Sequence, residues 1–136
     1  MAATIIDSDK VVVNASQEEV FAFLTNFNNI KELLPQDKIS DWQSDTEQCS
    51  FKIQNAAVIP LVKDQVTPSE KIHIKSGEKA PFPFTLDVTI NKLDDNSCEG
   101  ALHFEGDINA FLKMMVVKPL TNLFNYMAKR LQEVHA

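Results

Sequence analysis

The chain has 136 residues, of which 44% are hydrophobic, and 13 basic against 19 acidic residues give a formal net charge of -6. This length suits one domain spanning 1–136, with a sizeable core and no second domain. The acidic charge opposes binding to phosphate backbones, so a nucleic-acid partner is not expected.

Targeting signals are also not expected from the sequence. Asp7, Asp9, Glu18 and Glu19 interrupt the first 20 residues, which rules out a secretory signal. No stretch approaches the ~20 apolar residues of a membrane span, so stable membrane insertion is excluded. We therefore expect a cytoplasmic protein.

The first elements are a strand and two short helices. Residues 4–14 are rich in Ile and Val and lack Gly and Pro, which predicts a strand. The capping box at 16–19 predicts a helix that starts after Ser16. Asparagines at 26, 28 and 29 favour a turn before a second short helix, which Pro35 ends.

From residue 39 to about 108 the apolar residues alternate with a period of two. This pattern, broken by turn signals, predicts six further strands, at 38–45, 48–55, 57–67, 70–77, 82–93 and 97–107. The short turns between them indicate antiparallel neighbours. With the first strand, the sheet has seven strands.

The turn at 94–96 sets the register of the last two strands. It places Leu86 opposite Phe104 and Val88 opposite Leu102, so that both apolar faces lie on the inner side of the sheet. Phe51, Ile53, Ile72 and Ile74 extend this inner face. The strand at 57–67 leaves two registers open, one with Asp64 pointing inward and one with Lys63 pointing inward.

A long C-terminal helix is expected from about 109 to 134, capped by Asn109 or Asp107 and kinked at Pro119. From Leu120 onward it has an ordinary amphipathic stripe. Residues 108–117 are apolar nearly all round, more than one sheet-facing stripe requires. Their second partner is a ligand, a second copy of the chain or the two short helices.

Three segments resemble the Bet v 1-like/START (SRPBCC) superfamily: VVNASQEEVFAFLTNFNNIKELLP, PFPFTLDVTI and FLKMMVVKPLTNLFNYMAKRL. Within it, the chain is similar to the polyketide cyclase/dehydrase and lipid-transport family, which includes coenzyme Q-binding proteins. The resemblance implies an α+β helix-grip fold. In this fold a curved, seven-stranded antiparallel sheet, with two short helices after strand 1, grips a long C-terminal helix. It also implies a cavity between sheet and helix, without universal catalytic residues.

Strand faces and the apolar helix segment together predict a binding site for a small lipid-like or isoprenoid-like ligand. The expected wall lies between the sheet and the first half of the final helix, with Trp42 at the rim. The candidate ligand-binding residues are Trp42, Phe51, Leu86, Leu102, Phe104, Phe111, Met114 and Met115. If side chains fill this volume and leave no cavity above ~100 Å³, a protein-partner-binding module is the better interpretation. A cyclase- or dehydratase-like enzyme is a third alternative.

The sequence predicts no catalytic residue, cofactor or metal site. His73, Asp87 and His103 fall side by side, but on the outer face of the sheet, where opposite-charge cross-strand pairs are common. Cys49 and Cys98 fall at apolar positions of strands and are expected to stay reduced. The sequence does not indicate an oligomeric state.

Overall fold

The computed structural model describes residues 3–53 and 57–135. Eleven elements follow one another in the order expected for a strand, two short helices, a strand meander and a long helix. They are β1 (Thr4–Asp7), β2 (Val11–Val13), α1 (Gln17–Thr25), the 3-10 helix η1 (Phe27–Leu33), β3 (Ile39–Ser44), β4 (Gln48–Ile53), β5 (Val58–Thr67), β6 (Lys71–Ser76), β7 (Phe84–Asp94), β8 (Ser97–Gly106) and α2 (Ala110–Val134).

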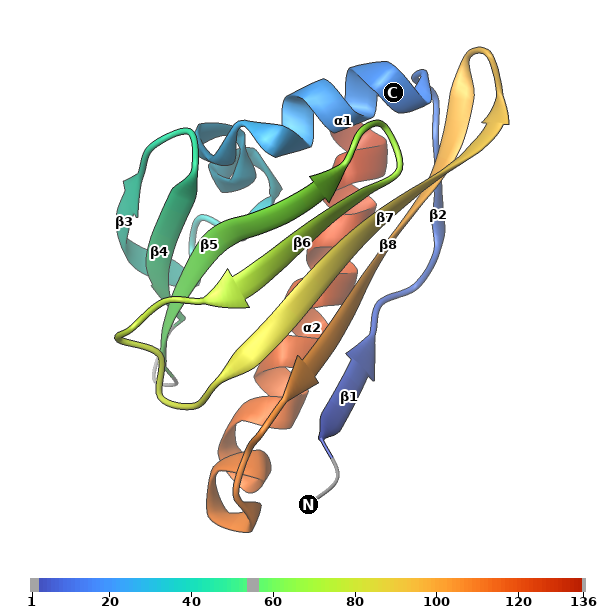
Figure 1. Cartoon of the computed structure of the whole chain (residues 1–136). Helices are drawn as coiled ribbons and strands as arrows, with labels where there is room; N and C mark the ends of the chain where they lie inside the picture. Colours follow the sequence, from blue (N-terminus) through green and yellow to red (C-terminus); the bar gives the residue numbers. More distant parts are fainter. Residues whose placement is uncertain (1–2, 54–56, 136) are drawn as a thin grey trace.

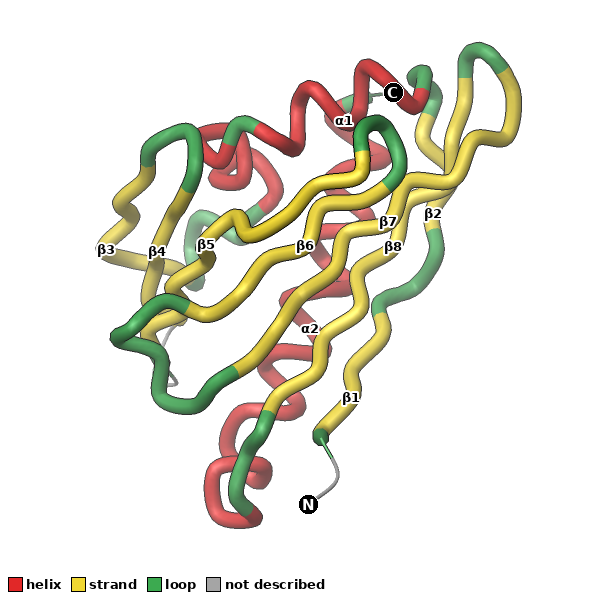
Figure 2. Tube along the Cα trace, viewed as in Figure 1, coloured by secondary structure: helices red, strands yellow, loops and turns green. Residues whose placement is uncertain are grey.

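The strands form one antiparallel sheet in the order β1-β8-β7-β6-β5-β4-β3, with β2 also paired to β8. Figure 1 shows that the sheet curves around α2, which lies against one of its faces, while α1 and η1 lie across one end. Figure 2 shows the same layering, with helix on one side of the strands. This confirms the predicted α+β helix-grip architecture.

The expected first strand, 4–14, is two strands, so the sheet has eight strands rather than seven. Asp7 pairs with His103, and Val11 pairs with Gly100. Three residues thus separate the paired positions in the edge strand but only two in β8, so the edge strand has one extra residue. Ser8 occupies the break, and its hydroxyl accepts a hydrogen bond from the Leu102 amide at 2.8 Å. A side-chain oxygen thus replaces a backbone partner, which periodicity does not reveal.

The predicted register of the β7–β8 hairpin is confirmed, with Leu86 opposite Phe104 and Val88 opposite Leu102. All four side chains are buried. The other strands agree with their predicted ranges to within one or two residues, except that residues 54 and 55 lie outside the described part of the chain. Turn position and alternation therefore suffice to fix the inner face of the sheet.

Side-chain caps start the helices where the sequence predicts. The Ser16 hydroxyl accepts from the Glu19 amide at 3.2 Å, and the Asn109 side chain accepts from the Leu112 amide at 2.9 Å. Helix α2 continues through Pro119 as one element. No helix within residues 3–53 and 57–135 has the length and hydropathy needed to span a bilayer.

Gly106 gives a test of the packing between sheet and helix. A Cβ atom at this position would lie 2.8 Å from the Phe104 ring, which is itself buried. We expect Gly106→Ala to lower the free energy of unfolding by about 1–3 kcal/mol, because the ring has to move within a close-packed core. Urea unfolding measures the change. Glu105→Ala, at the exposed neighbouring position, is the control, and equal stability of Gly106→Ala and the native chain would contradict this packing.

Candidate functional site

The volume between the sheet and the second half of α2 is filled by side chains. Phe51, Leu86, Leu102 and Phe104 all lie in the core, each no more than 4% exposed. The Phe104 ring packs against Phe124 of α2, with ring centroids 5.4 Å apart. These four predicted ligand-binding residues therefore hold sheet and helix together.

Two internal voids remain in this core, of about 20 Å³ and about 10 Å³. The first holds at most one water molecule, and neither can hold a lipid-like ligand. Neither void is the ligand cavity predicted between the sheet and the first half of α2, and by this criterion the packed core alone would favour a protein-partner-binding module. An open groove beside the core, described below, keeps ligand binding as the proposal. Strand phase shows which side chains point inward, but not how completely they interdigitate.

The other predicted wall residues lie elsewhere. Phe111, Met114 and Met115 are 72%, 87% and 49% exposed, on turns of α2 that extend beyond the ends of β1 and β8 (Figure 1). They do not share a volume with Phe104. The sequence shows that this segment is apolar, but not that the helix outreaches the sheet.

Trp42 lies on edge strand β3, as predicted. Its ring stacks on that of Phe51, with centroids 6.2 Å apart, and the side chain is half-buried. Asp41, just before it, has φ of 56°, at an irregularity in the pairing of β3 with β4. Trp42 thus covers the edge of the core, and a contact between Trp42 and a ligand stays a prediction.

An open groove lies beside the packed core, where the η1–β3 connection and the end of β4 meet the middle of α2. Its volume is about 500 Å³, within the size range of small-molecule sites. Its lining consists of Pro35, Asp37, Lys38, Ile39, Ile53, Lys118, Pro119, Asn122, Leu123 and Tyr126. Pro35, Ile53 and Leu123 are buried and form an apolar floor, while the polar residues are exposed at the rim.

Leu123 separates this groove from the interior. It lines the groove and also the void of about 10 Å³ beside Phe104 and Met127. Met127 lines both internal voids in turn. A rotamer change at Leu123 would therefore open the groove toward the core, since core side chains can change rotamer although they are close-packed.

A larger hollow, of about 910 Å³, lies on the opposite face of the sheet, over β4, β5 and β6. Gln48, Lys75, Glu78 and Lys79 are among its lining residues, and all four are exposed. Ligand sites are mostly apolar, with few polar groups. The smaller groove with its apolar floor is therefore the better candidate.

The structure shows which of Lys63 and Asp64 points inward from β5. Lys63 shares the inner phase with Ile59 and Leu61, and its ammonium nitrogen lies 2.7 Å from the Glu47 carboxylate and 5.5 Å from the centroid of the Phe27 ring. Asp64 points to the outer face, where it lies within 4 Å of His73 and Lys75. Lys63 is thus paired at one end of the sheet and does not line the groove.

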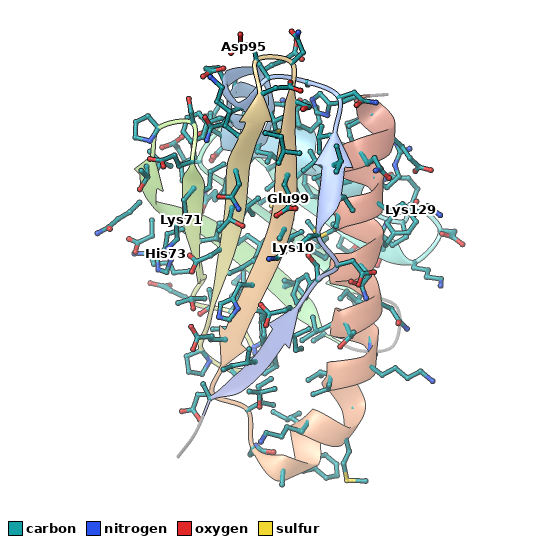
Figure 3. The ribbon with its side chains drawn as sticks, turned by 90° about the vertical axis from the view of Figure 1, so that its right-hand side faces the viewer. Lys10, Lys71, His73, Asp95, Glu99 and Lys129 are labelled. Carbon is teal, nitrogen blue, oxygen red and sulfur yellow. The ribbon has the colours of Figure 1, made fainter. Side chains whose placement is uncertain are left out.

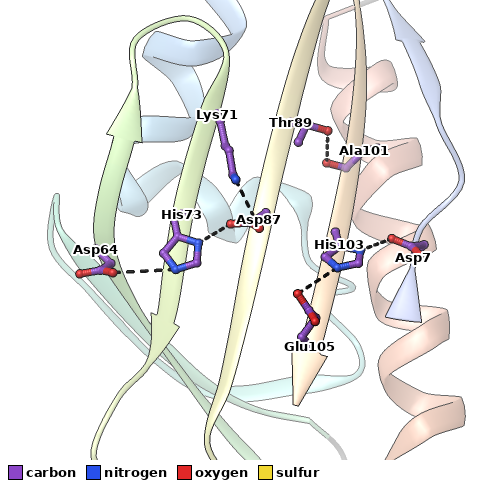
Figure 4. A network of polar contacts seen from close by, with 9 residues as sticks. All are labelled: Asp7, Asp64, Lys71, His73, Asp87, Thr89, Ala101, His103 and Glu105. Atoms are coloured by element: carbon purple, nitrogen blue, oxygen red, sulfur yellow. Dashed lines mark hydrogen bonds and ion pairs between the residues drawn. The ribbon is translucent and has the colours of Figure 1, made fainter. Parts of the chain in front are cut away.

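His73, Asp87 and His103 lie side by side on the outer face, as predicted, away from α2 (Figures 3 and 4). His73 contacts Asp87 through Nδ1. His103 contacts Asp7 of β1 through Nδ1, a pair that the sequence did not predict. Within residues 3–53 and 57–135, no group of three His, Cys, Asp or Glu side chains has a metal-binding arrangement. These pairs connect neighbouring strands, and the His103–Asp7 pair fastens β1 to β8.

Both cysteines are free and buried. Burial, with a smaller effect of the Asp45 charge, raises the pKa of the Cys49 thiol to about 12. Burial also raises the pKa of Cys98. A thiol with a raised pKa is a poor nucleophile and metal ligand, so neither cysteine is suited to catalysis.

The fastening of β1 predicts a pH dependence of stability. The hydrogen bond that the His103 imidazolium donates to the Asp7 carboxylate raises the pKa of His103, with a further contribution from Glu105. Because the folded chain holds this proton more tightly, the stabilisation is complete below the unfolded pKa of about 6.5 and is lost as pH rises through the folded value.

Urea unfolding at several pH values, with the native chain beside His103→Gln, measures this effect. The stability difference should shrink as pH rises above about 6.5. Asp7→Asn should show the same trend, because it removes the partner. A difference that stays constant with pH would contradict the assignment.

Sequence reasoning missed the groove because its residues come from three distant segments without a shared periodicity. Ile39 and Ile53 are terminal residues of paired strands, and Leu123 belongs to an ordinary helix stripe. The sequence does single out Pro35, Ile53 and Pro119, but as a helix stop, an inner-face residue and a helix kink rather than as parts of one site. The signal that existed was the apolar pair Ile39 and Ile53, which lie opposite each other at the open end of the β3–β4 hairpin.

No family model matches the chain, and no curated protein matches it. Solved structures do. Norcoclaurine synthase from Thalictrum flavum, as a point mutant with a transition-state analogue, has a TM-score of 0.75 at 13% identity, covering 97% of this chain and 93% of that one. XoxI from Bacillus cereus has a TM-score of 0.71 at 14% identity, covering 99% and 96%.

A START superfamily protein from Mycobacterium smegmatis has a TM-score of 0.69 at 13% identity, covering 96% of both chains. These likenesses extend over nearly the whole chain, but at identities that show the fold alone. The assignment to the polyketide cyclase/dehydrase and lipid-transport family stays a prediction. The fold of this chain is that of the Bet v 1-like/START superfamily.

Proposed function

We propose that the chain binds a small, mainly apolar ligand, lipid-like or isoprenoid-like, in the groove between residues 35–39, Ile53 and α2, without changing it covalently. The observation that carries this proposal is a hollow of about 500 Å³ with a floor of buried apolar side chains, next to an interior that is otherwise packed. The fold is compatible with such a role, since one of the similar structures is norcoclaurine synthase in complex with dopamine and hydroxybenzaldehyde.

The rim suggests the polarity of the ligand. The groove lining includes two lysines, Lys38 and Lys118, and a single carboxylate, that of Asp37. Asn122 and Tyr126 add groups that can donate or accept hydrogen bonds. An apolar molecule with one anionic end matches this arrangement, with its apolar part on Ile53 and Leu123.

The expected affinity is modest because the groove is open. Burying ~300 Å² of apolar ligand surface gives about 7 kcal/mol before ordering costs, which corresponds to micromolar binding at best. The groove lining contains no Cys, Ser, Thr or His, and its groups that can act as acid, base or nucleophile, Asp37, Lys38, Lys118 and Tyr126, are exposed at the rim. A protein that binds a ligand without changing it can act as a carrier or as a sensor of that ligand.

The first test fills the groove. Anilinonaphthalene sulfonate, an apolar dye with one anionic group, should bind the native chain with a rise in fluorescence. Asn122→Phe should weaken this binding by at least about tenfold, because the ring occupies volume above the floor. Lys129→Phe, an equally exposed position elsewhere on α2, is the matched control. Equal binding by both variants and the native chain would place the dye elsewhere and contradict the proposal.

The second test enlarges the groove. Leu123→Ala removes the side chain between groove and internal void, so we expect it to bind longer apolar chains more tightly than the native protein does. It should also cost about 2–5 kcal/mol of unfolding free energy. Leu131→Ala is the control: it is equally buried on α2 but borders only the other internal void.

Calorimetric titration with alkyl carboxylates of increasing length compares the two variants. Both should be destabilised, but only Leu123→Ala should gain affinity. A similar gain in Leu131→Ala would show that loosening the core, rather than opening the groove, determines binding.

A further inference from the structure

The first turns of α2 form an exposed apolar tip, defined by Phe111, Met114 and Met115. Phe111 and Met114 are 72% and 87% exposed, and of residues 110–117 only Val116 is buried. In Figure 1 these turns extend past the ends of β1 and β8. Exposed aromatic and Met side chains at adjacent helix positions form a contact surface rather than an ordinary solvated face.

The tip continues directly into the groove. Positions 111, 114, 115 and 118 lie on one face of an α-helix, because their spacing is three, four and seven. Asn122, one turn further along the same face, lines the groove together with Lys118. A surface that covers the tip therefore lies at the mouth of the groove.

The charge of α2 differs in sign from that of the whole chain. The chain carries a net charge of -6, yet the charged residues of α2 before Glu133 are Lys113, Lys118, Lys129 and Arg130. Lys113 lies within the tip and Lys118 directly follows it. The nearest acids along the chain, Glu105 and Asp107, precede the helix. An anionic surface is thus favoured at the tip and disfavoured over the rest of the molecule.

We propose that this tip docks the chain reversibly on an anionic lipid surface. Phe111, Met114 and Met115 would enter the interfacial region, while Lys113 and Lys118 contact the head groups. A protein partner fits less well, since a stable interface takes about 20–30 residues a side and the tip is a narrow projection. Docking does not depend on the groove being a ligand site, but it would bring the groove mouth to the lipid.

Vesicle sedimentation tests the proposal with the full chain. The native protein should bind vesicles of phosphatidylcholine and phosphatidylserine, bind phosphatidylcholine alone more weakly, and be released by salt, because salt screens the lysines. The double variant Phe111→Ser, Met114→Ser should lose more than about tenfold in partitioning, as two apolar side chains no longer leave water. Lys113→Gln should lose about fivefold on anionic vesicles only.

Leu93→Ser is the matched control, since Leu93 is 52% exposed on β7, two residues before Asp95. Figure 3 shows Asp95 at the opposite end of the molecule from the first turns of α2. Leu93→Ser should leave partitioning unchanged. Circular dichroism confirms that each variant is folded, which is expected because all the substituted side chains are exposed.

Absence of native binding to anionic vesicles would overturn the proposal, as would equal losses in the control and the double variant. A native dimer that the double variant converts to a monomer would assign the tip to a second copy of the chain instead. Dye binding by the folded double variant distinguishes failure of the docking proposal from failure of the groove proposal, because the dye reports on the groove and the vesicles report on the tip. Retained dye binding with lost vesicle binding supports docking by the tip alone.

Discussion

The packing of the second half of α2 into the concave face of the sheet is the interaction on which the rest of the structure depends. Phe124 lies against Phe104 of β8, and Phe104 lies against Phe82 and Phe84 in turn. Aromatic contacts of this kind add to the burial of large apolar surfaces. The sheet curves around this helix segment, so the stripe Leu120, Leu123, Phe124, Met127 and Leu131 organises the entire core.

Polar contacts at the edges fix the same helix segment in place. The Asn125 side chain accepts a hydrogen bond from the Asp9 amide at 2.8 Å, and Gln132 donates to the Val12 carbonyl at 2.9 Å. Arg130 reaches the Glu32 carbonyl at the end of η1. These contacts join α2 to the β1–β2 edge and to the short helices that lie across the end of the sheet.

Helix α2 is longer than the sheet face against which it packs, so the sheet does not cover the first turns of the helix. The packed half closes the interior around small voids, and the groove proposed as the ligand site lies beside Leu123. The uncovered half presents apolar and basic side chains to the outside. The tip therefore follows from the mismatch in length between the helix and the sheet.

The fold could be predicted from the sequence because its signals are local. Alternation and turn position determine the pairing of Leu86 with Phe104, and the Ser16 cap determines where α1 begins. The division of the first strand depends on a hydrogen bond from Ser8 to a distant strand, which no local pattern contains. Likewise, the choice between Lys63 and Asp64 depends on the pairing of β5 with β6, which is irregular between Lys63 and Gln65.

The candidate site was predictable only in its residue types. Met114 and Met115 were correctly identified as part of an apolar surplus, but their neighbours depend on where the sheet ends. Phe51 and Phe104 point inward as expected, yet they fill the volume that they were expected to line. The groove unites residues that are distant in sequence, such as Ile53 and Leu123. Alternation of apolar residues predicts which side chains point inward, but not how completely those side chains fill the space between sheet and helix.

If an apolar ligand occupies the groove, rather than the interior or the tip, methyl NMR spectra recorded during titration with anilinonaphthalene sulfonate will reveal it, because they report on each site at once. We expect saturable shifts of the Ile39, Ile53 and Leu123 methyl groups, with little change at Leu102. Shifts confined to the Met114 and Met115 methyl groups would contradict it.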